Sequence, residues 1–155
     1  MKTLRLSCAH ALFKFLIAQK TIIDGQKVPL FPGAFAIYGH GNVACLGQAM
    51  EEFQSDLPGY RGHHEQSMAL SGIGYARAMR RKQIFIATSS SGPGAMNMVT
   101  AAGVALSNRL PLLLLPGDVF ASRFPDPVLQ QVENFNSPVE NQNDAFKPVS
   151  RFFDR

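Results

Sequence analysis

The sequence is short of charge. Only 17% of its 155 residues are Asp, Glu, Lys or Arg, whereas an average globular domain carries about 25%. Because the cores of protein interfaces are depleted in charged residues, this shortage favours a surface that other subunits or domains partly cover. A chain that simply carries fewer charges than usual is the alternative. The length predicts a single domain, residues 1–155, with one sizeable core.

Cysteine is scarce, and long apolar runs are missing. Cys8 and Cys45 have neither the number of a disulfide framework nor the spacing of a metal-ligand pair, and Cys45 lies in an apolar pattern that predicts a core position. No stretch has the form of a signal peptide, and none approaches the roughly 18–20 apolar residues of a membrane span. We therefore expect a soluble, cytoplasmic protein without a membrane partner.

The net charge of +4 comes from scattered basic residues and one cluster, at Arg77, Arg80, Arg81 and Lys82. Cations oppose the negative pole of the helix macrodipole, so the cluster predicts the C-terminal end of a helix. Aromatic side chains do not interleave with a basic face, which is the pattern of nucleic-acid binding. Nucleic acid is therefore not an expected partner.

Strand and helix patterns alternate along the chain. Helical spacing predicts helices over 7–20, 43–53, 65–81 and 95–109, with shorter ones over 128–135 and 144–153. Apolar runs predict strands over 34–38, 83–90 and 110–118, the last of them fully buried, and Asp24-Gly25 predicts a hairpin before them. The alternation predicts an α/β domain of three layers, with a central, mainly parallel sheet flanked by helices.

The stretch "FAIYGHGNVACLG" raises a specific alternative. After the strand, Gly39, Gly41 and Ala44 fit the G-x-G-x-x-A turn of dinucleotide-binding folds, and Glu65 lies 24 residues after Gly41, where a ribose-binding acid is expected. Two features count against it: a helical pattern precedes the strand, and 57–65 is too rich in proline, glycine and histidine for a good second strand. A Rossmann-like dinucleotide-binding domain stays an open alternative.

Polar loops follow the predicted strands or open the predicted helices: "GHGN", "GHHEQ" and "SSSGPG". In open α/β sheets, ligands bind at that edge, so these loops are the candidate site. The sequence has no G-x-S-x-G nucleophile elbow and no H-x₃-H or C-x₂-C metal pair. No residue of this chain is therefore expected to ligate a metal.

The loops and helices, taken in order, resemble a known family. "YGHGN", "GHHEQSMALSGIGYARAM", "IFIATSSSGPGAMN" and "LPLLLLPGDV" are similar to the pyrimidine-binding domain of thiamine-diphosphate enzymes of the acetolactate synthase type. Within that family the segments "DGQKVPLFPG" and "PGDVFASRFPDPVLQQVE" resemble a C–C bond hydrolase that acts on a cyclic dione in myo-inositol degradation. An acetolactate synthase-like carboligase or decarboxylase is the alternative that the same resemblance implies.

The resemblance implies roles for individual residues. Glu65 matches the glutamate that shares a proton with N1′ of the cofactor's aminopyrimidine, a role that asks for a buried carboxyl, and His40 is a second catalytic candidate. The residues implied in cofactor binding are Glu65, Gly39, Gly41, Asn42, Ser91, Gly92, Pro93, Gly94 and Asn97. Substrate contacts are implied for His40, His64 and Gln66. Each histidine has a structural alternative, as a cap or a loop residue, and Asp118 replaces the family's usual glutamine.

The resemblance also implies missing parts. The family holds the diphosphate and Mg²⁺ through a G-D-G motif in a second domain, generally from another subunit, and this sequence has no G-D-G. We therefore expect this chain to be the N-terminal part of a longer enzyme, to share thiamine diphosphate with that second domain, and to be inactive alone. A homodimer or homotetramer is the expected assembly.

Overall fold

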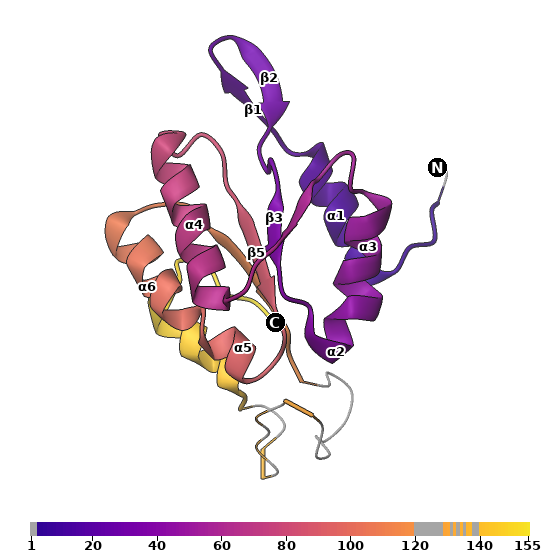
Figure 1. Cartoon of the computed structure of the whole chain (residues 1–155), viewed down its shortest axis with the longest axis vertical. Coiled ribbons are helices and arrows are strands. Elements are labelled where there is room, and N and C mark those ends of the chain that lie inside the picture. The colour runs from indigo at the N-terminus through magenta and orange to yellow at the C-terminus, as the bar shows by residue number, and fades with distance from the viewer. Residues whose placement is uncertain (1–2, 120–128, 131, 133, 135, 138–139) are drawn as a thin grey trace.

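The computed structural model describes residues 3–119, 129–130, 132, 134, 136–137 and 140–155. They form three layers, with helices on both faces of a central sheet (Figure 1). The predicted short helix over 128–135 lies largely outside the described residues. No helix in the described ranges is long and apolar enough to cross a membrane.

The central sheet is parallel throughout. Its four strands, in the order β4-β3-β5-β6, are β4 (Gly59–Arg61), β3 (Ala34–Ala36), β5 (Ile86–Ser89) and β6 (Leu113–Pro116). Phe35 lies opposite Tyr60 in β4 and Ala87 in β5, and Ala87 lies opposite Leu114 in β6. The sheet and the three layers confirm the predicted fold class.

The first helix and the hairpin form as their local sequences predict. Ser7 caps helix α1 (Cys8–Ala18) by accepting a hydrogen bond from the His10 N–H at 3.2 Å. Strands β1 (Lys20–Ile23) and β2 (Gln26–Pro29) pair antiparallel, and Asp24 and Gly25 turn between them at φ of 50° and 81°. The hairpin stands out from the body of the domain (Figure 1).

Each face of the sheet has its own apolar cluster. On one face, α1 and α3 (Gln48–Glu52) bury Phe13 and Met50 against β3. On the other face, α4 (Glu65–Ala78), α6 (Val99–Asn108) and the 3₁₀ helix η2 (Gln142–Val149) bury Ile73, Met98 and Phe146 against β5. These two clusters fix the sheet between its helices and thereby fix the loops at its carboxyl edge.

Several expectations need correction. The sequence predicts a poor strand over 57–65, but Gly59–Arg61 form β4 by pairing with β3. Strand β6 is half-buried rather than fully buried, because it is the edge strand of the described sheet. Cys45 is exposed rather than buried, as are its neighbours Val43 and Ala44. The helix predicted over 95–109 is broken after α5 (Pro93–Met96) and resumes as α6.

The expected exit turn after β3 is also helical. Gly39–Asn42 form one turn of α-helix, α2, which continues as the π-helix η1 (Val43–Gly47) into α3. The helix predicted over 43–53 thus starts four residues early and includes an irregular turn. Single π-turns are frequent at functional sites, which draws attention to this segment.

Candidate functional site

The strand order places the candidate site. Strand β3 comes first in the chain and lies between β4 and β5. The strand order therefore runs outward from β3 on one side and from β5 on the other, and it switches between β3 and β5. Ligands of open α/β sheets bind outside the carboxyl ends of the strands at such a point. Helix α2 follows β3 there, and the loop 90–92 and α5 follow β5, all at the lower end of Figure 1.

The glycine turn (Gly39–Asn42) and the serine loop (residues 89–94) pack directly against each other at this point. Gly39 has φ of 62°, and a Cβ added to it would lie 2.3 Å from Ser90 Cβ. The Asn42 side chain donates to the Ser89 carbonyl oxygen at 3.0 Å. Two of the predicted loops are therefore joined by contacts that only glycine at position 39 permits.

Gly117 completes this contact from the end of β6. Its N–H donates to the Ser89 carbonyl oxygen at 3.0 Å, and an added Cβ would lie 2.5 Å from the backbone nitrogen of Ser91. Gly117 was not predicted as a site residue, and Ser90, although part of the predicted "SSSGPG" loop, was given no role of its own. The signals for them were the doubled serine before "GPG" and a glycine placed directly after an apolar strand.

Glu65 lies on the other side of the serine loop. It is the first residue of α4, it is half-buried, and its Oε2 accepts a hydrogen bond from Asn97 Nδ2 at 3.0 Å. Its Oε1 lies 3.0 Å from where a Gly94 Cβ would stand, and Ser90 Oγ would be 2.3 Å from that same Cβ. The structure thus brings together the predicted Glu65, Gly94 and Asn97. The Glu65 side chain is half-buried in this chain, whereas the predicted role requires a buried carboxyl.

The hydrogen bonding of the Glu65 carboxylate suits a ligand group that can share a proton with it. Asn97 holds one carboxylate oxygen, and no described residue donates a hydrogen bond to the other. An aminopyrimidine ring nitrogen is such a group, because it is neutral or protonated according to its partner. Gly94 has no side chain to cover Oε1, so this oxygen is the one available to a ligand.

Glu65 does not occupy the position that a dinucleotide site requires. Strand β4 ends at Arg61, and Glu65 opens a helix rather than ending the strand. These observations do not favour the Rossmann-like alternative.

Gly92 shapes the serine loop. Its φ of 68° and ψ of −129° lie in a region that is difficult for any residue with a side chain, and it precedes Pro93, the first residue of α5. Ser91 is half-buried beside it, and Gly92 and Gly94 are buried. Among residues 90–94 Pro93 alone is exposed, so the loop is a closely packed element.

The histidines are arranged differently from one another. His40 and His63 are exposed, and Gly41 beside His40 has open space around it. His64 is the N-cap of α4, where its Nδ1 accepts from the Ser67 N–H at 3.4 Å. Gln66 is half-buried, and no hydrogen bond within the described ranges links it or a histidine to Glu65.

A cleft of about 740 Å³ opens beside this site, between α3 and the ends of β3 and β4. Gly39 and His63 line it, together with Tyr38, whose hydroxyl donates to Met50 Sδ at 3.1 Å. Burial, and then the negative charge of Glu51, raise the pKa of Tyr38 above its ordinary value. Tyr38 was not among the predicted site residues, although it directly precedes the glycine turn.

The described residues contain no group of three or more His, Cys, Asp or Glu side chains that could hold a metal ion.

Comparison with known proteins identifies the family. Residues 33–137 match the family of thiamine pyrophosphate enzymes, N-terminal TPP binding domain. This range includes every site residue that the sequence predicted.

Relatives match over the whole chain. It is 53% identical over 155 residues to the 3D-(3,5/4)-trihydroxycyclohexane-1,2-dione hydrolases of Clostridium tetani and Geobacillus thermodenitrificans, and 50% identical over 154 residues to that of Listeria monocytogenes. The matches cover 99–100% of this chain and 24% of each relative, so the chain spans about a quarter of their length. The chain belongs to the thiamine pyrophosphate enzymes, and it corresponds to their N-terminal TPP binding domain.

Proposed function

We propose that this chain is the pyrimidine-binding domain of a thiamine-diphosphate-dependent C–C bond hydrolase that acts on a trihydroxycyclohexanedione in myo-inositol degradation. The observation that carries the proposal is the Glu65 carboxylate, which Asn97 holds at one oxygen and no described residue holds at the other, in a chain about half identical to hydrolases of that name. An acetolactate synthase-like reaction has no comparable support.

Glu65 is the residue that holds the proton. Asn97 and the first turn of α4 orient its carboxyl, and Oε1 is the atom at which it would share a proton with N1′ of the aminopyrimidine. Gly92, Pro93 and Gly94 would bind the ring through the backbone of the closely packed loop. The cofactor, when bound, supplies an electron sink for cleavage of a bond next to a carbonyl.

The turn after β3 would complete the site. Gly39 and Asn42 hold it against the serine loop, while His40 and Gly41 remain exposed and free to meet cofactor or substrate. His40 is our candidate for polarising a substrate hydroxyl or carbonyl, because its ring is not engaged by any described side chain. Gln66 and His64 are weaker substrate candidates, since His64 already caps α4.

The remaining parts of the site would come from a second domain. We propose that the full-length protein, like its longer relatives, carries a diphosphate-binding domain that holds Mg²⁺, and that this domain meets Glu65 from another subunit of a homodimer or homotetramer. The low charge of this chain supports an extensive contact surface. We place the enzyme in the cytoplasm.

The substitution Glu65→Gln in the full-length protein tests the proposal. It keeps the size and the Asn97 contact but cannot share the proton, so we expect hydrolase activity to fall at least about 100-fold, in the range that general acid–base groups supply. Thiamine diphosphate should still bind, as measured by calorimetry. Glu52→Gln is the matched control, because Glu52 is 59% exposed and pairs with His10 on the far face of the sheet. Unchanged activity in Glu65→Gln would refute the assignment.

A second experiment separates the alternatives. The purified full-length protein should hydrolyse trihydroxycyclohexanedione, should not form acetolactate from pyruvate, and should bind thiamine diphosphate but not NAD⁺. Acetolactate formation would support the carboligase alternative, and NAD⁺ binding would support the dinucleotide site. His40→Ala should lower the rate of hydrolysis without lowering the melting temperature, because the side chain is exposed.

A further inference from the structure

The serine loop needs a partner for its own backbone. Gly92 is the N-cap of α5 but has no side chain to cap it, and the following Pro93 has no N–H. The Gly92 N–H therefore needs an acceptor from outside the loop. That acceptor helps to fix the loop beside Glu65, in addition to the contacts that hold Ser89 and Ser90.

Two neighbouring residues at the start of η2 hold this region. In the amide orientation assigned from its hydrogen-bond partners, Gln142 accepts from the Gly92 N–H at 3.1 Å and donates to the Val132 carbonyl oxygen at 2.5 Å. Asn143 Nδ2 donates to the Gly117 carbonyl oxygen at 2.9 Å. Because Gly117 in turn contacts Ser91, the two side chains reach the loop directly and through the end of β6.

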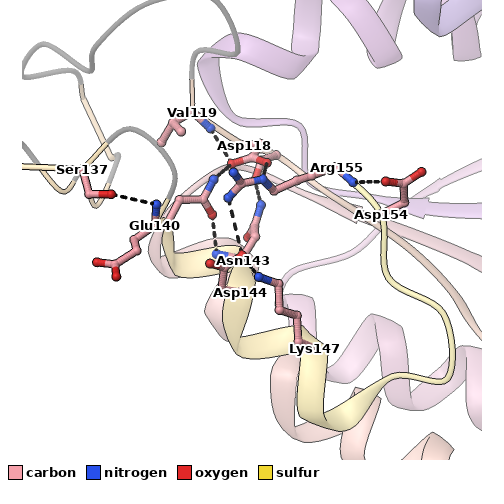
Figure 2. Close-up of polar contacts among 11 residues, drawn as sticks. Asp118, Val119, Ser137, Glu140, Asn143, Asp144, Lys147, Asp154 and Arg155 are labelled. Atoms are coloured by element: carbon pink, nitrogen blue, oxygen red, sulfur yellow. Dashed lines mark hydrogen bonds and ion pairs between the residues drawn. The ribbon is translucent and has the colours of Figure 1, made fainter.

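The start of η2 is itself fixed by a polar network that Figure 2 shows. Asn141 Nδ2 donates to Asp118 Oδ1, and Asn141 Oδ1 accepts from the Asn143 N–H at 2.7 Å. Arg155 Nε lies 3.9 Å from Asp118 Oδ2, and Arg155 Nη1 lies 3.5 Å from Asp144 Oδ1. Farther along η2, Phe146 is 4% exposed and belongs to the core cluster of α6. The helix is anchored at its start and at Phe146 in its middle.

Asn143 is costly for stability. It is 2% exposed, and its Oδ1 has no hydrogen-bond partner within the described residues. A buried oxygen without a partner destabilises the folded state, so stability alone does not account for an asparagine here. Its Nδ2 contact with Gly117 is what the residue supplies.

From these contacts we infer that Gln142 and Asn143 are positioning residues of the cofactor site. They set the Gly92–Gly94 backbone, and with it the space beside Glu65 Oε1, without touching the cofactor. This inference rests on the proposed function. Its consequence is that loss of the Gln142 acceptor weakens cofactor binding more than it slows the reaction at saturating cofactor.

The test uses two substitutions of equal length in the full-length enzyme. Gln142→Met removes the acceptor, and Gln142→Glu keeps an oxygen that accepts from Gly92. We expect Gln142→Met to raise the apparent KM for thiamine diphosphate about fivefold, the factor that one ordinary hydrogen bond is worth, and to lower kcat less than about twofold. Gln142→Glu should raise KM less than Gln142→Met, because it keeps the acceptor for Gly92 but loses the donor to the Val132 carbonyl oxygen. Ala145→Ser, at an exposed position of the same helix, is the control and should leave KM unchanged.

Two outcomes would overturn the inference. One is a KM for thiamine diphosphate that does not change in Gln142→Met. The other is a KM that rises equally in Gln142→Met and Gln142→Glu while the melting temperature falls in both, which would make the residue purely structural. Glu65→Gln is measured in parallel: if it is active, the proposed function fails, whereas if it is inactive and Gln142→Met is normal, only the positioning role fails.

Discussion

The two glycine-containing segments of the site differ sharply in their surroundings. In the turn of α2, Gly39 is packed against Ser90, but His40 and Gly41 face open space. In the serine loop, Gly92 and Gly94 are buried, and Gln142 holds the loop from outside. Both segments follow strands at the same edge of the sheet, so the difference comes from what packs on them rather than from where they start.

This difference separates two tasks. The serine loop is held from several sides and gives Glu65 a fixed neighbour at Gly94. The α2 turn is held at Gly39 and Asn42 and leaves its other residues available for contacts outside this chain. We expect substitutions in the loop to affect stability and cofactor binding together, and those at the exposed tip of the turn to affect function alone.

The largest effect should come from Gly117→Ala. Its added Cβ would lie 2.5 Å from Ser91 N and 2.9 Å from the Ser90 carbonyl carbon, and backbone atoms cannot move aside cheaply. We expect the free energy of unfolding to fall by about 3 kcal/mol, the upper part of the range for overpacking. Denaturant unfolding measures it, with Gly103→Ala as the control, because there the added Cβ is in ordinary contact with Val149. A loss of less than about 0.5 kcal/mol would mean that the loop is not held as described.

Gly39→Ala and Gly41→Ala sharpen the contrast within the turn. Alanine at 39 must adopt φ of 62° and meet Ser90, so we expect a loss of about 2 kcal/mol. Alanine at 41 meets nothing within 4 Å and lies in a helical turn, so it should be neutral or stabilising by up to about 1 kcal/mol. Equal losses in melting temperature for the two variants would contradict the distinction.

Substitutions of His64 should change stability only slightly, and they distinguish a helix cap from a residue that binds substrate. His64→Ala removes the acceptor for the Ser67 N–H, and the bond is long at 3.4 Å, so we expect a loss of about 0.5 kcal/mol. His64→Asn supplies another N-cap and should restore the melting temperature. If activity recovers with stability, His64 acts as a cap, whereas activity that stays low in His64→Asn would assign it to substrate.

The smallest effect should appear only at alkaline pH. Burial and Glu51 raise the pKa of Tyr38 above 10.0, so the folded protein keeps this proton where the unfolded chain loses it. The stabilisation is present below about pH 10 and is lost as pH rises toward the folded pKa. Tyr38→Phe should therefore make the alkaline fall in melting temperature shallower. Burial also raises the pKa of Tyr75, which lies away from the turn, so Tyr75→Phe is the comparison variant. An alkaline profile that Tyr38→Phe leaves unchanged would contradict the assignment.

Sequence reasoning succeeded where the signal is local. The cap at Ser7, the hairpin at Asp24-Gly25 and the start of α4 at Glu65 each follow from a few adjacent residues. It failed where burial depends on neighbours: Cys45 is apolar in pattern but exposed, and β6 is apolar throughout but lies at an edge. The site was predicted as a set of loops, but not as a set of contacts.

The sequence by itself determined most of the strands and helices, the parallel α/β class and the family, because periodicity, turn residues and short motifs are local properties of the chain. It missed β4, because residues 59–61 are a strand only through their pairing with β3. Only the tertiary structure decided that Asn97 holds Glu65, that Ser90 fills the space beside Gly39, and that Gln142 holds Gly92. These partners are far apart along the chain, and they meet because two apolar clusters hold the sheet and its helices in one arrangement.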